Sequence, residues 1–450
     1  MVPLYFSNLV TCFSISGDGK LVSALIAGFR SQKELLYQTG LSFIARVLAA
    51  LAGFIVSLVI GRYLGAEGAG YYFLAFSILM FLSAISRVGL DDSVIKYTGA
   101  AVPQGEWGEV RDVIKKSLLV AFIFSAFSAC ALYFLSDFIA QFIFEKPELS
   151  SVLQAISPGV VGLSLFTLIA MSLQGLRRVI ASVFTVNITV NLLLVLAIVS
   201  LEFEASDDVA FAYSVASGLT VVIGGYLLLS SVSKGRGRIA WGELFQSCMP
   251  LWIVVLMQQT VQWSGQFIAG VWVESEQVAQ FAVAQRTALL VTFILMAVNL
   301  VVAPRFANMY KQGRTDQLER LALTSVKLML VFAFPVVLVM LVFPEYIMGL
   351  FGPGFRGGAL LLQILAIGQL INVATGSVGY LLTMSGHEKE MRNATLISGP
   401  IALGLGFLLT PVFGVTGAAV ATSIAIAVQN LVAVWWVRKR LGFNTLAVWR

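Results

Sequence analysis

The sequence predicts an all-α polytopic membrane protein with twelve transmembrane helices in two six-helix lobes. Three observations support this fold class: the composition, the spacing of apolar windows and an internal repeat. The chain has 450 residues, of which 58% are hydrophobic and 12% are charged. Soluble domains carry about 25% charged residues, and the mean hydropathy here is +0.90. Lipid is therefore the expected solvent for most of the chain.

Apolar windows of about 20 residues, the length of a transmembrane helix, occur at twelve places along the chain. The segments between them alternate in basic content, and 24 of the 29 Lys and Arg residues fall in alternate segments. Cytoplasmic segments are rich in Lys and Arg, so both termini are expected in the cytoplasm. The windows are centred near residues 52, 79, 127, 164, 190, 220, 259, 289, 332, 370, 402 and 426.

The basic segments and the repeat described below divide the chain into three parts. Residues 1–39 are predicted to form a cytoplasmic extension, because they lack the basic start of a cleavable signal peptide. Residues 40–233 and 234–450 are the predicted N-terminal and C-terminal six-helix lobes. The net charge of +6 lies in short clusters between apolar spans, which indicates topology signals and no nucleic-acid partner.

The two halves of the chain share a repeat at an offset of 209 residues. The segment 61–76, "GRYLGAEGAGYYFLAF", aligns with 270–285, "GVWVESEQVAQFAVAQ", and the same offset carries Gly159 onto Gly368. Because each repeat contains six spans, the two lobes have the same orientation, related by a pseudo-two-fold axis along the membrane normal. Such repeats place the substrate between the lobes.

Two basic residues lie inside predicted spans, Arg286 near the middle of the eighth and Arg46 near the start of the first. A charge at mid-membrane is costly and usually faces a polar cavity, and no Asp or Glu lies in the middle of any predicted span. We therefore expect Arg286 to line a cavity for an anionic substrate; the alternative is a structural role bonded to carbonyls or amides. Arg46 has either a substrate role or a side chain that reaches the membrane surface.

The seventh span contains an unusual stripe of amides within "LMQQTVQWSGQF", residues 256–267. Gln259, Gln262, Trp263 and Gln266 share one helical face. Amides and a tryptophan ring suit sugar hydroxyls and sugar C–H faces, so this face is predicted to line a hydrated cavity. The alternative is bonding between helices. Asn187 and Asn191 on the fifth span are candidates for the same cavity; Gln174, Gln285, Asn299, Gln369, Asn372, Gln429 and Asn430 are each explained as readily by local packing.

Four basic residues, Arg87, Lys96, Arg177 and Arg178, lie at the predicted cytoplasmic mouth. They serve as topology signals or guide an anionic headgroup. The sequence has no GxxxxGK[ST] phosphate loop, and His387 is its only histidine. We therefore predict no catalytic residues, no metal site and no cofactor, with a Na⁺ or H⁺ gradient as the candidate driving force.

The segment "GRYLGAEGAGYYFLAFSILMFLSAISRVGLDDSVIKY" (61–97) resembles the first repeat of polysaccharide flippases in the multidrug/oligosaccharidyl-lipid/polysaccharide (MOP) exporter superfamily. The matching features are the turn Arg62–Gly65, the pair Gly89–Leu90 and Lys96, and the stretch "LFGPGFRGGALLLQILAIG" (350–368) is similar to the start of the tenth span. The likeness covers about residues 38–442. It implies a MATE-like fold and a transporter, not an enzyme, in a bacterial or archaeal plasma membrane.

The implied substrate is a polyprenyl-pyrophosphate-linked oligosaccharide, flipped from the cytoplasmic to the outer leaflet for surface polysaccharides such as O-antigen. The implied partners, besides the bilayer, are a polysaccharide polymerase and chain-length machinery. The main alternative within the superfamily is a cation-coupled multidrug antiporter. An antiporter typically needs an intramembrane carboxylate, whereas this chain has intramembrane arginines. A third class, a membrane glycosyltransferase, would call for catalytic acids and a large outer loop, and the loops here are short.

Overall fold

The computed structural model describes residues 19–233, 235 and 237–447, with side chains from residue 45 onward except those of Arg46, Pro250 and Leu251. The chain divides into two compact units, Met1–Ile44 and Ala45–Arg450. In the first unit the described backbone, residues 19–44, is helical. Residues 1–18 of the predicted extension lie outside the described part. The fold below concerns the second unit.

The described chain contains eleven helices that are long and apolar enough to cross a membrane. The first of them, Val47–Ser86, includes Gly65 with φ 67° and ψ −174°, a non-helical conformation inside the run. The positive φ suits glycine, which has no Cβ. Dividing the helix at Gly65 separates the first two predicted spans, and the described part then contains the twelve spans that the sequence predicts. The all-α membrane fold is confirmed.

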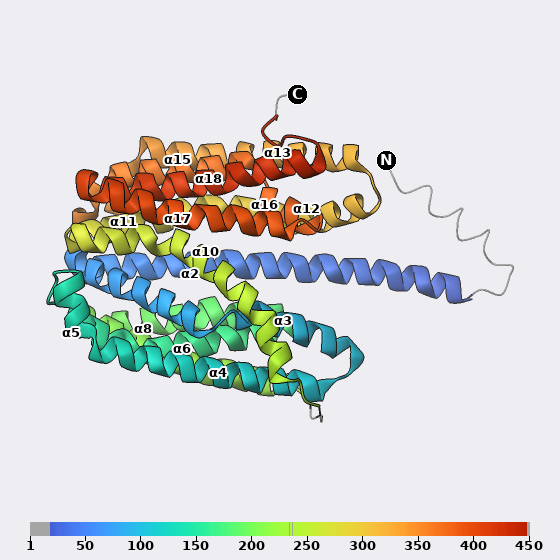
Figure 1. Cartoon of the computed structure of the whole chain (residues 1–450), viewed down its shortest axis with the longest axis horizontal. Helices are drawn as coiled ribbons and strands as arrows, with labels where there is room; N and C mark the ends of the chain where they lie inside the picture. The colour runs from blue at the N-terminus through green and yellow to red at the C-terminus, as the bar shows by residue number, and fades with distance from the viewer. Residues whose placement is uncertain (1–18, 234, 236, 448–450) are drawn as a thin grey trace. The chain divides into compact units, whose positions relative to one another are not determined.

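Each predicted span centre falls inside a helix, and several spans combine an α-helix with a short 3₁₀ or π segment. Figure 1 shows the helices in chain order. Their bounds are α2 Gly19–Ser86, α3 Leu90–Ala101, η1 Val102–Gln104, α4 Trp107–Phe134, α5 Ser136–Phe138, η2 Ile139–Ile143, α6 Leu149–Gly175, α7 Val179–Val183, η3 Phe184–Thr189, α8 Val190–Leu201, α9 Ser206–Leu229, α10 Trp241–Trp272, α11 Ser275–Ala288, η4 Leu289–Val291, α12 Thr292–Lys311, α13 Thr315–Val342, α14 Pro344–Gly349, η5 Pro353–Gly358, α15 Ala359–Thr375, α16 Val378–Met384, α17 Glu388–Phe413 and α18 Val415–Leu441.

The N-terminal lobe packs around α6, which contacts α3, α4 and α9. Small polar side chains join α6 to α2 and to α9: Ser83 and Ser164 share a hydrogen bond of 2.9 Å between their hydroxyls, and Ser214 Oγ donates to the carbonyl of Ala155 at 2.8 Å. Small residues let membrane helices approach closely, and their hydroxyls bond across the interface. In the C-terminal lobe α15 and α17 pack on α18, and α13 packs on α15 (Figure 1).

The lobes meet at the end of the bundle that carries Gly65, which we call the Gly65 end. Arg62 Nε donates to the carbonyl of Leu350 at 2.9 Å, and Lys146 Nζ donates to the carbonyl of Gly270 at 2.7 Å. The two contacts lie in segments that the repeat relates, because Gly61, next to Arg62, is the counterpart of Gly270, and each glycine lies against the other lobe. Gly61 faces Phe351 and Phe355, and Gly270 faces Leu74 and Phe144.

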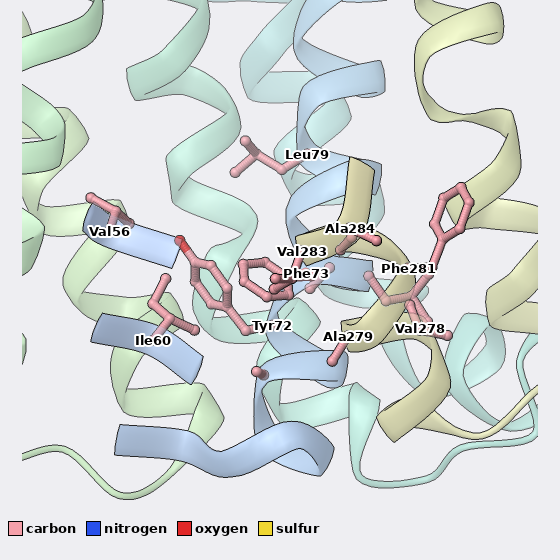
Figure 2. Packing of buried hydrophobic residues seen from close by; sticks show 14 of the residues in the cluster. Val56, Ile60, Tyr72, Phe73, Leu79, Val278, Ala279, Phe281, Val283 and Ala284 are labelled. Atoms are coloured by element: carbon pink, nitrogen blue, oxygen red, sulfur yellow. The ribbon is translucent and has the colours of Figure 1, made fainter. Parts of the chain in front are cut away.

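A hydrophobic cluster fills the space between the lobes near this end. Figure 2 shows Val56 and Ile60 on one side of Tyr72 and Phe73. On the other side it shows residues of α11: Val278, Ala279, Phe281, Val283 and Ala284. The three helical segments come from both sides of Gly65 and from the second lobe. The cluster therefore joins the two lobes directly beside Arg286, whose guanidinium lies over the ring of Phe73.

Candidate functional site

Arg286 lies in the last turn of α11, within the span Ser275–Lys311. At 1.5 Å per residue its Cα is roughly 16 Å from the start of this span. That length is about half of the ~30 Å hydrocarbon core of a bilayer. Arg286 is therefore a mid-membrane arginine, as the sequence predicts.

The contacts of Arg286 are with neutral groups. Its Nη1 donates to Ser57 Oγ at 2.6 Å, and the guanidinium lies 4.3 Å from the ring centre of Phe73 and 5.4 Å from that of Phe76. Aromatic faces attract a cation through their quadrupole. The three ion pairs among the described residues are Arg87–Asp91, Lys116–Asp112 and Arg440–Glu390. Aromatic rings and a hydroxyl thus hold the guanidinium, and no described carboxylate neutralises its charge.

Arg286 lines a cavity of about 390 Å³ between the lobes. Four other sequence-predicted residues line the same cavity: Gln262 and Trp263 on α10, Asn187 on η3 and Asn191 on α8. The remainder of the wall is largely aromatic and aliphatic. The cavity thus combines one positive charge, several amides and apolar rings, a set of groups that can hold a ligand with an anionic and a polar part.

The two asparagines are placed by an irregular stretch of the fifth span. Asn187 lies in the π-helical segment η3, and Asn191 Nδ2 donates to the Asn187 carbonyl at 2.6 Å. Such π-helical segments are frequent at functional sites. The π-helical segment thus lies where two polar side chains, Asn187 and Asn191, line one wall of the Arg286 cavity.

A second cavity of about 450 Å³ lies in the C-terminal lobe, with Gln259 in its wall. Gln262 lines both cavities. The amide stripe of α10 is therefore divided, with Gln258 and Gln259 on the second cavity, Trp263 on the first and Gln262 between them.

Gln266 differs from the other members of the stripe. Only 1% of its surface is exposed, it lines neither cavity, and its Nε2 donates to the carbonyl of Phe73 at 2.5 Å. The physical reason is that α10 meets α2 at this level, so the Gln266 side chain is buried between the helices and bonds across the interface, which is the alternative role given above for this stripe.

The predicted mouth residues do not line either cavity. Arg87 is buried and bonded to Asp91 at 2.9 Å and to Ser83 Oγ, so it serves the packing of its own helix end. Lys96, Arg177 and Arg178 are exposed. The side chain of Arg46 lies outside the described residues; Ala50, four positions further along the helix, lines the first cavity.

Four residues of the first site were not singled out by the sequence: Ser57, which accepts the Arg286 bond, and the cavity residues Tyr72, Phe76 and Tyr213. Tyr72 and Phe76 are spaced i, i+4 and their rings stack at 6.0 Å. This spacing was visible in "YYFLAF", but an aromatic pair on a membrane helix does not by itself indicate which face meets an arginine.

The fold is the one found in transporters of the MOP superfamily. The structure is similar to an inward-facing multidrug resistance MATE family transporter of that superfamily, with TM-score 0.73 and 15% identity, covering 89% of this chain and 98% of that one. It is also similar to the lipid II flippase MurJ in an inward closed conformation, with TM-score 0.71 and 15% identity, covering 88% and 87%. At these identities the likeness shows the fold.

Within that class, the chain belongs to the family described as "Polysaccharide biosynthesis protein", whose profile matches residues 35–310. The MatE profile matches residues 250–408. Among relatives, the "Probable low-salt glycan biosynthesis flippase Agl15" of Haloferax volcanii is 24% identical, covering 86% of this chain and 80% of its own. "Stage V sporulation protein B" of Bacillus subtilis is 20% identical, covering 92% and 85%. The resemblance to polysaccharide flippases of the MOP superfamily is confirmed.

Proposed function

We propose that the protein flips a polyprenyl-pyrophosphate-linked oligosaccharide from the cytoplasmic to the outer leaflet for the synthesis of a surface polysaccharide. The single observation that carries this proposal is Arg286 in the inter-lobe cavity. Its guanidinium contacts Ser57 and the rings of Phe73 and Phe76 and has no carboxylate partner among the described residues. A planar guanidinium binds phosphate oxygens in bidentate fashion, so the cavity suits the pyrophosphate of such a lipid.

The walls of the cavity fit the remaining parts of this substrate class. Gln262, Asn187 and Asn191 offer amide donors and acceptors to hydroxyl groups, and Trp263 offers a ring face. The polyprenyl chain would remain in the surrounding lipid. The location of the cavity between two repeat-related lobes supports alternating access, in which the lobes open first toward one side of the membrane and then toward the other.

Substitution of Arg286 tests the proposal in cells that depend on this protein for surface glycan. Arg286→Ala should abolish surface display because the cavity loses its charge, whereas Arg286→Lys should keep partial activity because a point charge remains. Immunoblotting of membranes must show equal protein levels. The matched control is Arg305→Ala, an exposed arginine further along the same span, which should display glycan normally. Normal display by Arg286→Ala would contradict the anion-binding role.

A cation-coupled multidrug antiporter is the second candidate function. It is favoured by the MatE match to residues 250–408 and by the structural likeness to a multidrug resistance transporter. Against it, the described lining of the two cavities contains no Asp or Glu, and a positive cavity repels a cationic drug. Expression in a drug-sensitive strain separates the two: resistance to cationic dyes that requires a Na⁺ or H⁺ gradient would support the antiporter.

A further inference from the structure

The second cavity, of about 450 Å³, lies entirely within the C-terminal lobe and is distinct from the Arg286 site. Its amide side chains come from five helices of this lobe: α10, α11, α12, α15 and α18. Representative members are Gln259, Asn299, Asn372, Gln429 and Asn430. Pockets of roughly 300–1,000 Å³ are of the size that binds small molecules. The amides therefore converge on a space large enough for a ligand.

Apart from the size and shape of the cavity, two buried oxygens in its lining residues also indicate a ligand. Asn299 is 4% exposed and Ser377 is 6% exposed, and both residues line the cavity. Neither Asn299 Oδ1 nor Ser377 Oγ has a hydrogen-bond partner among the described residues. A buried polar group without a partner is costly. Both oxygens are enclosed, so a ligand that carries hydroxyl groups would satisfy them by drawing these two lining side chains into the cavity.

The lining of the cavity also limits the charge of its ligand. The described lining contains no Asp, Glu, Lys, Arg or His, and its polar members are amides, hydroxyls and the phenol of Tyr380. An amide both donates and accepts hydrogen bonds, and so does a hydroxyl. The ring of Tyr380 is 46% exposed and offers an apolar face. A neutral, hydroxyl-rich ligand matches this set better than a phosphate or a cationic drug.

We propose that this cavity is a carbohydrate subsite for neutral sugar residues of the transported glycan. The inference rests on the proposed flippase function and adds to it that the pyrophosphate and the sugars bind in different cavities. Arg286 holds the pyrophosphate in the first cavity, and the amide cavity of the C-terminal lobe holds the sugars. Gln262 and Leu289 line both cavities, so the two lie side by side, and in this proposal one lipid-linked glycan extends past these residues from the first cavity into the second.

The test is a binding measurement with two probes on the purified full-length protein in nanodiscs. One probe is a polyprenyl-pyrophosphate-linked oligosaccharide from membranes of the source organism, and the other is polyprenyl pyrophosphate without sugar. Asn299→Leu combined with Ser377→Ala should weaken binding of the glycolipid by about fivefold for each hydrogen bond lost. Binding of the sugar-free lipid should not change.

Thermal stability separates a ligand site from a structural network. Because the two substituted oxygens have no partner in the protein, the double variant should melt at the same or a higher temperature. Gln363→Leu is the matched control: this amide of α15 lines neither cavity, and its Nε2 donates to the Leu341 carbonyl at 2.9 Å. Its substitution should lower the melting temperature and leave binding of both probes unchanged.

The outcomes distinguish failure of the carbohydrate subsite from failure of the proposed flippase function. Equal binding of the glycolipid by the double variant and the unmodified protein would overturn the carbohydrate subsite. So would an equal loss for both probes, or a change confined to Na⁺ dependence, which would indicate a cation site. If instead Arg286→Ala binds both probes normally while the double variant loses only the glycolipid, the pyrophosphate role of Arg286 fails and the carbohydrate subsite stands.

Discussion

Two glutamines one helical turn apart on α10 have different surroundings. Gln262 is exposed and lines both cavities, whereas Gln266 is buried and bonded to the Phe73 carbonyl. Gln266 Oε1 is buried without a hydrogen-bond partner among the described residues. The same residue type therefore serves a cavity surface at one position and helix packing at the next.

This pair gives a prediction with an internal control. Gln262→Leu should reduce glycolipid affinity several-fold, because it removes an amide shared by both cavities, and should leave thermal stability nearly unchanged. Gln266→Leu should leave affinity unchanged. Its stability should change by about 1 kcal/mol or less, because the lost hydrogen bond is partly offset by removal of the unpaired oxygen. Binding and melting curves of both variants check this; a loss of affinity in Gln266→Leu with normal affinity in Gln262→Leu would contradict it.

The sequence predicts which residue types reach the candidate site but not which face each presents. A mid-span arginine and a row of amides have no favourable place in lipid. The mid-span position of Arg286 and the helical spacing of the amides therefore predict a common cavity, and the structure has Arg286, Gln262, Trp263, Asn187 and Asn191 in one cavity lining. The position of Gln266 could not be predicted, because it depends on where α10 crosses α2. The unpaired oxygens of Asn299 and Ser377 likewise depend on tertiary packing.

At the scale of elements, the junction between α2 and α3 depends on Gly89. Its φ is 71°, and a Cβ at this position would lie 2.5 Å from the Cys248 carbonyl oxygen and 2.7 Å from the Trp252 nitrogen of α10. Both the backbone conformation and the contact with the other lobe's first helix therefore require glycine. This is the Gly89–Leu90 pair on which the family resemblance was based.

Alanine substitutions at Gly89 and at Gly105 should separate the cost of the left-handed backbone from the cost of the contact with α10. Gly89→Ala should destabilise the protein by about 2–5 kcal/mol, from the left-handed conformation and from overpacking against α10. Gly105→Ala has a similar φ of 74° with no atom within 4 Å, so it should cost only about 1–2 kcal/mol. Reversible unfolding in mixed micelles measures both. Equal losses would show that the contact with α10 contributes nothing.

Most elements of the fold could be predicted from the sequence because lipid imposes a simple rule on composition and length. Each of the twelve predicted span centres lies in a helix. The structure departs from the predicted spans where the helices are irregular. The first two spans form one run across Gly65, and the fifth and eighth spans contain π or 3₁₀ segments. These details depend on packing against neighbouring helices, which hydropathy does not encode.

At the scale of the whole second unit, residues 45–450, the two lobes are joined at the Gly65 end by contacts from segments that the repeat relates. Arg62 and Lys146 each donate to a backbone carbonyl of the opposite lobe, at Leu350 and Gly270. Basic-residue alternation predicts that this end faces outward. If the lobes alternate, these contacts must break for release of substrate to the outside.

A cross-link at this end gives the last prediction. A Cβ built on Gly354 would lie 2.9 Å from Ala66 Cβ, slightly closer than the ~3.5–4.5 Å of a disulfide, so a small shift allows bonding. Ala66→Cys with Gly354→Cys, in a background without the three native cysteines, should transport normally when reduced. On oxidation it should lose transport while still binding glycolipid, because the lobes can no longer separate at this end.

The controls are the two single-cysteine variants, which should transport normally under oxidising conditions. Gel mobility after proteolysis between the lobes measures the extent of cross-linking. Reduction should restore transport, since the block is a covalent link and not damage to the cavity. Full transport by completely cross-linked protein would show that the lobes need not separate here, and the substrate would then have to cross by a route that leaves the Gly65 end closed.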